Sequence, residues 1–239
     1  MGSLLFWRKP ENFEYTKQFI PLIEKCKTFI DVGANIGYYS ILAGKLNPEI
    51  AVYAYEPAQG PFHFLNQNVS VNNLNHQIQP FQIALGKKSD TIDFYESINL
   101  KYSYLTHHLG GVGTTLKNNT FHPHKVRSET LDSIIQTNKI LGVDLIKLDT
   151  EGTELEILEG CTHSINQFRP IVISEILFNK IEAQLETYFT ALNYRMFYPL
   201  SDGLKEVKTI VRSKDDGVRN CFFIPQEQVH SLKDLIQIS

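Results

Sequence analysis

The feature that most constrains this chain is an alternation of short apolar runs with segments of helical spacing. Five apolar runs of strand length lie at residues 28–32, 50–56, 78–85, 143–149 and 170–176. Helical patterns lie at residues 38–46, 62–73, 130–139, 153–160 and 179–193. Near-continuous apolar strands that alternate with helices predict a mostly parallel sheet that helices cover on both faces. The fold class is therefore expected to be α/β.

Two late apolar runs, YRMFYP and CFFIPQ, are expected to complete the sheet as an antiparallel pair. No helical segment separates them, and a parallel crossover normally carries a helix. Residues 87–130 interrupt the alternation with a polar, glycine-rich stretch, which predicts one or two hairpin strands around a long loop that is mobile at about residues 100–120. We therefore expect a helical lead-in at residues 1–27, followed by one domain at 28–239 that contains this insertion.

Composition and charge exclude several classes of partner. The formal net charge of −3 provides no basic field that would attract nucleic acid or an anionic membrane. The three cysteines are far apart, show no metal-binding spacing, and favour a reducing compartment. No run approaches the roughly 18 apolar residues of a membrane span, and the N-terminus lacks a signal-peptide pattern. We expect a cytoplasmic protein with no membrane span and no nucleic-acid partner.

The turn in FIDVGANIGYYS carries the clearest ligand-binding pattern in the chain. It lacks the glycine spacing of a dinucleotide fingerprint and the Gly-Lys-Ser/Thr of a P-loop. It has instead Asp31 at a strand end, Gly33 and Gly37 where a backbone can approach closely, and Asn35, which tolerates a left-handed backbone. These groups suit a ligand with an amino group and a carboxylate, because N–H groups at a helix start bind carboxylates.

Glu56 supplies a second half of the same site. It ends the second strand, 25 residues after Asp31, and an acid at that place accepts both hydroxyls of a ribose. A ribose, an amino-acid tail and no phosphate together describe S-adenosylmethionine. The alternative is that Asp31 and Glu56 only cap helices on a sheet of unrelated use.

Several motifs follow one another in a specific order, namely FIDVGANIGYYSIL, VYAYEPAQGPFHFLNQNVSVNN, IALG, TLDSII, VDLIKLDTEGTELEILEG and PIVISEI. From about Thr28 to Ile176 the sequence resembles the FkbM family of S-adenosylmethionine-dependent methyltransferases. The resemblance implies a class I, Rossmann-like fold with a seven-stranded, mostly parallel sheet whose last strand is antiparallel. It also implies O-methylation, often of sugar hydroxyls or polyketide products. The residues expected to bind the cofactor are Asp31, Gly33, Asn35, Gly37, Tyr38, Glu56 and Ala84.

The stretch KLDTEGTELE, after the fourth strand, holds the densest group of ionisable residues. Asp149 and Glu151 follow the strand end, and Glu175 ends the neighbouring fifth strand, so we expect these three acids to be catalytic. In one interpretation an acid removes the proton of the acceptor hydroxyl or orients that hydroxyl. In the other, the three acids hold a divalent cation. Glu154 and Glu156 are expected only to complement the dipole at a helix start.

The acceptor is expected to contact the inserted segment. Tyr104, His107 and His108 lie in its glycine-rich part, where aromatic faces suit sugar rings and glycines suit a hinge. The two histidines of FHPHKVR are expected to share the solvent-facing side of a strand.

Two other functions fit such a fold. A nucleic-acid methyltransferase would carry a basic patch and an Asn/Asp-Pro-Pro-Tyr/Phe motif where this chain has KLDTEG. A non-catalytic S-adenosylmethionine-binding or scaffold module would be favoured by loss of Glu56 or of the glycines, and none is lost. We therefore expect an O-methyltransferase that acts on a hydroxyl of a sugar, a glycan or a small secondary metabolite.

Overall fold

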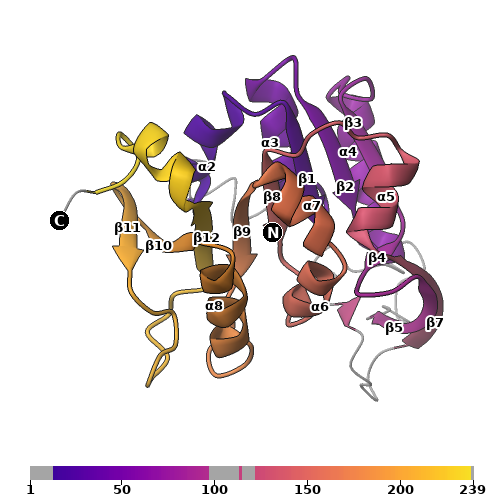
Figure 1. Cartoon of the computed structure of the whole chain (residues 1–239). Helices are drawn as coiled ribbons and strands as arrows, with labels where there is room; N and C mark the ends of the chain where they lie inside the picture. Colours follow the sequence, from indigo (N-terminus) through magenta and orange to yellow (C-terminus); the bar gives the residue numbers. More distant parts are fainter. Residues whose placement is uncertain (1–12, 97–112, 115–121, 238–239) are drawn as a thin grey trace.

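The computed structural model describes residues 13–96, 113–114 and 122–237, and in these residues an eight-stranded sheet forms the centre (Figure 1). The strand order is β11-β10-β12-β9-β8-β1-β2-β3. The strands are β1 (Thr28–Val32), β2 (Ala51–Tyr55), β3 (Ile78–Phe81), β8 (Leu145–Leu148), β9 (Ile171–Glu175), β10 (Tyr194–Leu200), β11 (Gly203–Val207) and β12 (Asn220–Pro225). Neighbours from β3 to β9 pair in parallel, and the pairs from β9 to β11 are antiparallel.

The mostly parallel α/β architecture is confirmed, and so is the antiparallel pairing of β10 with β12. The sheet holds eight strands instead of the seven that we predicted. The additional strand, β11, follows β10 through a tight turn in which Leu200 pairs with Gly203. Its sequence GLKEV has exposed polar residues at its centre and little apolar pattern, as an edge strand allows.

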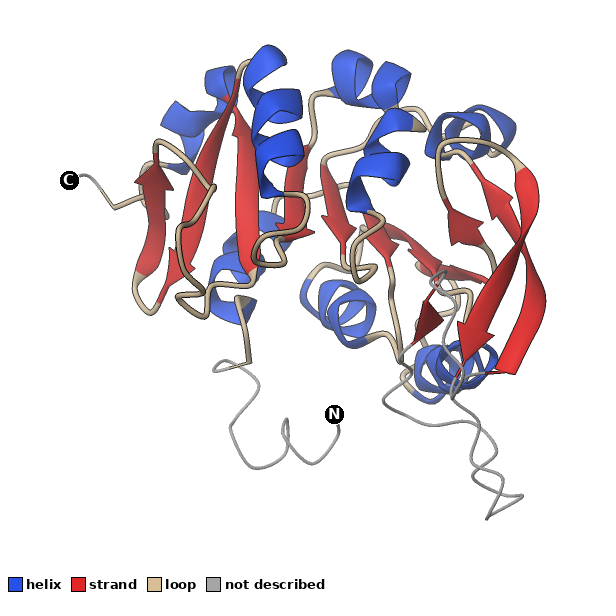
Figure 2. Cartoon of the chain, turned by 90° about the horizontal axis from the view of Figure 1, so that it is seen from below, coloured by secondary structure: helices blue, strands red, loops and turns tan. Residues whose placement is uncertain are grey.

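Helices cover both faces of the sheet, as Figure 2 shows from below. One face carries α2 (Thr16–Ile23), α3 (Tyr38–Leu46), α4 (Gln59–Val71) and the 3₁₀ helix η3 (Gln226–Leu232). The other carries α5 (Leu131–Thr137), α6 (Glu154–Glu159), α7 (Thr162–Phe168) and α8 (Glu182–Ala191). The five predicted helices are present, whereas the sequence THSINQF of α7 is too short and polar to show a helical apolar pattern.

Two hydrophobic cores explain why the strands are apolar without alternation. Successive side chains of a strand point to opposite faces, so each strand contributes to both cores. In β1, Phe29 packs among α2 and α3, and Ile30 packs among α5 and α6, and both side chains are fully buried. A polar residue at either position would leave an unpaired group in one of the cores.

A second, four-stranded sheet with the order β4-β7-β5-β6 lies beyond the carboxyl end of β3. Its strands are β4 (Ala84–Leu85), β5 (Asp90–Glu96), β6 (Gly113–Thr114) and β7 (His122–Glu129). The predicted strand at 78–85 is therefore divided between the two sheets. The predicted hairpin in the insertion is confirmed, because β5 and β7 pair antiparallel over seven residues each. Most of the stretch at about 100–120, with Tyr104, His107 and His108, lies outside the described residues.

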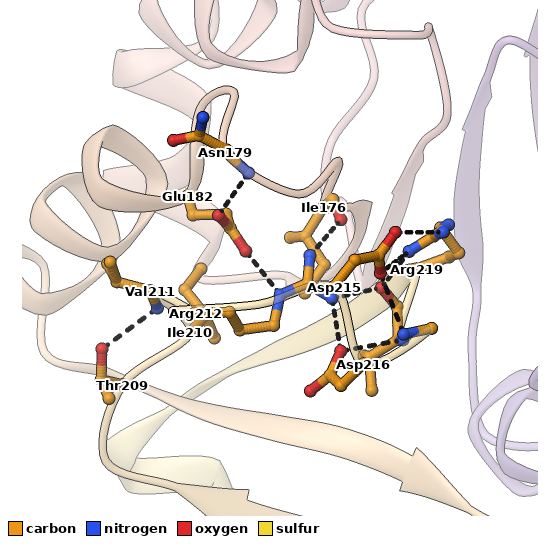
Figure 3. A network of polar contacts seen from close by, with 12 residues as sticks. Ile176, Asn179, Glu182, Thr209, Ile210, Val211, Arg212, Asp215, Asp216 and Arg219 are labelled. Atoms are coloured by element: carbon orange, nitrogen blue, oxygen red, sulfur yellow. Dashed lines mark hydrogen bonds and ion pairs between the residues drawn. The ribbon is translucent and has the colours of Figure 1, made fainter.

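The connection from β11 to β12 is fixed against the end of β9 by Arg212 (Figure 3). Its guanidinium donates to Glu182 Oε1 at 2.6 Å, to Asp216 Oδ1 at 2.7 Å and to the Ile176 carbonyl at 3.0 Å. The side chains of Arg212 and Glu182 are both buried, and a buried ion pair is stable only when its hydrogen bonds are satisfied in this way. The network therefore holds the segment that directly follows Glu175.

None of the helices within the described ranges has the length and apolar character that crossing a membrane requires. The three cysteines, Cys26, Cys161 and Cys221, are buried free thiols.

Candidate active site

A cavity of about 580 Å³ lies at the carboxyl ends of β1, β2 and β8. Val32 pairs with Tyr55 on one side and with Leu148 on the other, so the residues that follow these strands leave the sheet next to one another. The next residues in the chain, Gly33, Glu56 and Asp149, line the cavity together. Strand order reverses at β1, which is where open α/β sheets bind their ligands.

The turn from Gly33 to Gly37 crosses directly over the end of β8. Gly33 and Gly37 have φ values of +69° and +87°, and Asn35 between them has a φ of +53°. The amides of Gly33 and Ala34 both donate to the Tyr55 carbonyl at 3.0 Å, which ties the turn to β2. A Cβ at Gly33 would lie 1.9 Å from the Asp149 carbonyl oxygen. Only glycine permits this approach, as the sequence pattern indicated.

A buried ion network underlies the turn. The Nζ of Lys147 lies 3.4 Å from Asp31 Oδ1 and 3.2 Å from Asp149 Oδ2, and it donates to the Gly33 carbonyl at 3.3 Å. Asp31 also accepts from Ser40 Oγ at 2.6 Å. Burial alone would lower the pKa of Lys147, but the charges of Asp149 and Asp31 outweigh it and raise that pKa. Lys147 is therefore a permanent cation in this site.

Asp31 takes part in this network without lining the cavity. Asp31 is only 1% exposed and is not among the residues that line the cavity, whereas Lys147, its partner, is. The described contacts of Asp31 are with Ser40 and Lys147, beneath the cavity wall. A direct contact of Asp31 with the cofactor stays a prediction.

Glu56 joins the two turns that follow β1 and β2. Its Oε2 accepts from the Asn35 amide and its Oε1 accepts from the Ala58 amide, both at 2.8 Å. The side chain lines the cavity and is buried. These two bonds fix the orientation of the carboxylate in the cavity wall.

The small sheet supplies an apolar part of the cavity wall, which includes the predicted residue Ala84. The other apolar lining residues from this region are Ile83, Leu85, Ile92 and Phe94. The predicted residue Tyr38 lines the cavity from the start of α3 and shares a 3.0 Å hydrogen bond with Thr16 Oγ1. His124 packs its ring against Phe94 at 5.6 Å and is not a lining residue.

The three predicted acids come together at the edge of the cavity. Carboxylate oxygens of Asp149, Glu151 and Glu175 lie within 4.8 Å of one another, and the first two residues line the cavity. Burial, together with the charges of Asp149 and Glu151, raises the pKa of Glu175 to about 8. The Oε2 atom of Glu175 is buried and makes no hydrogen bond within the described residues. Burial and Asp149 also raise the pKa of Glu151.

Glu154 shapes the turn that presents these acids. It begins α6, as its predicted dipole role requires, but it is 1% exposed and its Oε1 accepts from the Thr150 amide at 2.9 Å and the Gly152 amide at 3.3 Å. Glu151 and Gly152 both have positive φ values, of 60° and 112°. Glu154 is therefore a buried structural acid that stabilises a left-handed turn.

Two lining residues, Phe13 and Glu14, come from the segment before the first strand. They belong to no recognisable motif, and the pattern of that segment predicted only a helical lead-in. Lys147 was the third residue that the sequence did not assign, although a lysine inside an apolar strand is a detectable signal of a buried ion pair.

The parallel sheet and the cavity at its reversal point define a Rossmann-like α/β protein with a ligand site at the carboxyl edge. The FkbM methyltransferase domain family matches residues 31–196, more than half of the chain, and the chain belongs to this family. The predicted cofactor turn, Glu56 and the three clustered acids all lie within the matched region.

Known proteins agree with this assignment. The chain is similar to the hexuronic acid methyltransferase AglP of Haloferax volcanii, with 26% identity over 172 residues that cover 68% of this chain and 65% of AglP. It is also similar to methyltransferase 1 of Beauveria bassiana, with 26% identity over 144 residues, 55% of this chain and 57% of that protein. The chain thus spans 57% and 65% of the lengths of these relatives.

A crystal structure of methyltransferase FkbM from Methylobacillus flagellatus shares the fold. The TM-score is 0.54 at 16% identity, and the match covers 82% of this chain and 43% of that one.

Proposed function

We propose that this protein transfers a methyl group from S-adenosylmethionine to a hydroxyl oxygen of a sugar, a glycan or a small metabolite. The observation that carries the proposal is the cavity in which Gly33, Glu56 and Asp149 meet, in a chain of the FkbM methyltransferase family. A sugar acceptor is supported by the relative AglP, which is named for hexuronic acids.

The residues around the cavity fit this cofactor. The buried Glu56 carboxylate is a suitable acceptor for ribose hydroxyls, and the amides at the start of α3 suit a carboxylate. The apolar wall from the small sheet suits an adenine ring. When bound, S-adenosylmethionine supplies an electrophilic methyl group on a sulfonium centre.

The chain itself must remove the proton of the acceptor hydroxyl. Asp149 is paired with the cation of Lys147, which fixes the orientation of its carboxylate. Glu175 has a buried oxygen with no hydrogen bond to the described part of the chain and a raised pKa, so we assign it as the proton acceptor and Asp149 as the residue that orients the hydroxyl. The alternative is that the three acids hold a divalent cation, since their oxygens lie close enough to share one.

The first test concerns the cofactor. Glu56→Gln is expected to weaken S-adenosylhomocysteine binding at least tenfold in isothermal titration calorimetry, because hydrogen bonds to a charged acceptor contribute about 1.5–3 kcal/mol each. Glu49→Gln is the matched control, because Glu49 is exposed and precedes the amino end of the same strand, away from the cavity. An unchanged dissociation constant in a folded Glu56→Gln variant would rule out the assignment.

The second test concerns pH. Turnover is expected to rise from pH 7 through about 8 and to level off near pH 9, because Glu175 must lose its proton to act as a base and its pKa is raised to about 8. The pH profile of kcat/KM for Glu175→Gln should lack this rise. A wild-type profile that is flat between pH 7 and 9 would exclude Glu175 as the proton acceptor.

Stability provides an independent readout of the same group. Because the native state keeps the Glu175 proton above the ordinary pKa of 4.5, the unfolded chain binds fewer protons between that value and about 8. The contribution of Glu175 to the free energy of unfolding therefore falls as pH rises through this window. Urea denaturation at pH 6 and pH 9 should show a smaller loss of stability for Glu175→Gln than for the wild type.

A further inference from the structure

The segment before β1 forms part of the cavity wall and is held there by aromatic contacts. The ring of Phe13 lies 4.9 Å from that of Tyr38, and the ring of Tyr15 stacks on that of Tyr39 at 4.7 Å. Tyr15 is 1% exposed. Glu14 lies between two anchored aromatic residues, so its position beside the cavity is set by the packing of its neighbours.

The Glu14 side chain is directed to the start of α3. Its Oε2 accepts from the Tyr39 hydroxyl at 3.1 Å, and Glu14 lines the cavity although solvent reaches it. The backbone of Glu14 has a φ of +42°, a left-handed conformation that a glutamate rarely adopts. Glu14 also lies outside residues 31–196, the part of the chain that matches the family.

The charges at this end of the cavity are unbalanced. Glu14 interacts electrostatically with both Asp149 and Lys147. Asp31 and Asp149 each lie within 3.4 Å of the Lys147 ammonium, which also donates a hydrogen bond to the Gly33 carbonyl. Three carboxylates thus face one cation, and the described contact of Glu14 is with a neutral hydroxyl. The arrangement favours a ligand that brings positive charge.

We propose that Glu14 binds the α-ammonium group of the cofactor's amino-acid tail. The inference rests on the proposed function, in which the amides at the start of α3 hold the carboxylate of that tail. The ammonium is bonded to the same carbon as the carboxylate, so it must lie beside the start of α3, where Glu14 contacts Tyr39. Glu14 is the lining acid that is hydrogen-bonded to α3 and not ion-paired with Lys147 in the described structure.

The test compares a ligand that has the amino-acid tail with one that lacks it, using the full chain and isothermal titration calorimetry. S-adenosylhomocysteine has the amino-acid tail without a sulfonium charge, and 5′-methylthioadenosine has neither. Glu14→Gln keeps the shape and can still accept from Tyr39, but it removes the charge. We expect Glu14→Gln to weaken S-adenosylhomocysteine binding about tenfold or more and to leave 5′-methylthioadenosine binding within about twofold.

Glu24→Gln is the control, because Glu24 is an exposed acid that directly follows the neighbouring helix α2. It should leave both affinities unchanged. Three results for Glu14→Gln would overturn the inference: unchanged S-adenosylhomocysteine binding, an equal loss for both ligands, or a loss seen with S-adenosylmethionine alone, which would place Glu14 at the sulfonium. A wild-type chain that does not bind S-adenosylhomocysteine would instead contradict the proposed function, and the inference with it.

Discussion

Gly33→Ala is expected to lower the free energy of unfolding by about 4 kcal/mol or more, which is exceptional for one methyl group. The added Cβ would lie 1.9 Å from the Asp149 carbonyl oxygen, so either the turn or the end of β8 must move. The left-handed backbone of Gly33 adds about 1–2 kcal/mol for any residue with a Cβ. Urea denaturation measures the loss, and S-adenosylhomocysteine binding should fall with it.

Gly152→Ala separates the steric contact from the left-handed backbone as causes of the lost stability. Gly152 also has a positive φ, of 112°, but a Cβ there would meet no atom of the described residues within 4 Å. It should therefore show only the backbone term of about 1–3 kcal/mol. If Gly33→Ala is no less stable than Gly152→Ala, the close crossing of the turn over β8 does not exist in solution.

Asp149→Asn and Glu151→Gln are expected to lower turnover by about 10²–10⁴-fold, the usual contribution of a positioned acid–base group. Both side chains line the cavity and lie within the acid cluster, whereas Glu56 and the glycine turn remain intact for the cofactor. The dissociation constant for S-adenosylhomocysteine should change by no more than about threefold. That is well under a tenfold change, which corresponds to about 1.4 kcal/mol. Glu156→Gln is the matched control, because Glu156 is an exposed acid that lines the same cavity outside the cluster.

Chelation then separates the two roles of the cluster. Loss of turnover with a chelator and recovery with a divalent ion would make the acids metal ligands. Turnover that is insensitive to chelation would leave them as base and orienting residue. If both amide variants turn over the true acceptor at near-normal rates, Asp149 and Glu151 take no part in catalysis, and Glu175 and the histidines of the insertion are left as candidates for the proton acceptor.

Local patterns were sufficient for most of the main sheet and for the turn from Gly33 to Gly37. The apolar runs placed β1, β2, β8 and β9, because each strand is buried on two faces and must be apolar throughout. The turn could also be predicted from the sequence, because left-handed backbone positions such as Gly33 and Asn35 favour a few residue types. The acids at the ends of β8 and β9 were predicted to meet because the carboxyl ends of parallel neighbours share one edge.

Patterns failed where pairing or contact depended on partners distant in the chain. β3 and β4 form one apolar run, and only the presence of β7 assigns its second half to another sheet. Glu154 lies at a helix start, where the sequence predicts only an acid that complements the helix dipole. The structure shows that it is buried and accepts a hydrogen bond from the Thr150 amide, so its main role is structural.

The sequence by itself determined the order of strands and helices along the chain and the left-handed turn from Gly33 to Gly37. It also determined that the motifs at the strand ends lie at one edge of the sheet. These features follow from residue periodicity and backbone sterics, which act over a few positions. Only the tertiary structure decided that Asp31 lies beneath the cavity and pairs with Lys147, and that Glu14 joins the cavity from outside the family match. Such contacts join residues far apart in the chain, and they exist because the aromatic packing of the N-terminal segment and the parallel register of β1 with β8 bring those residues together.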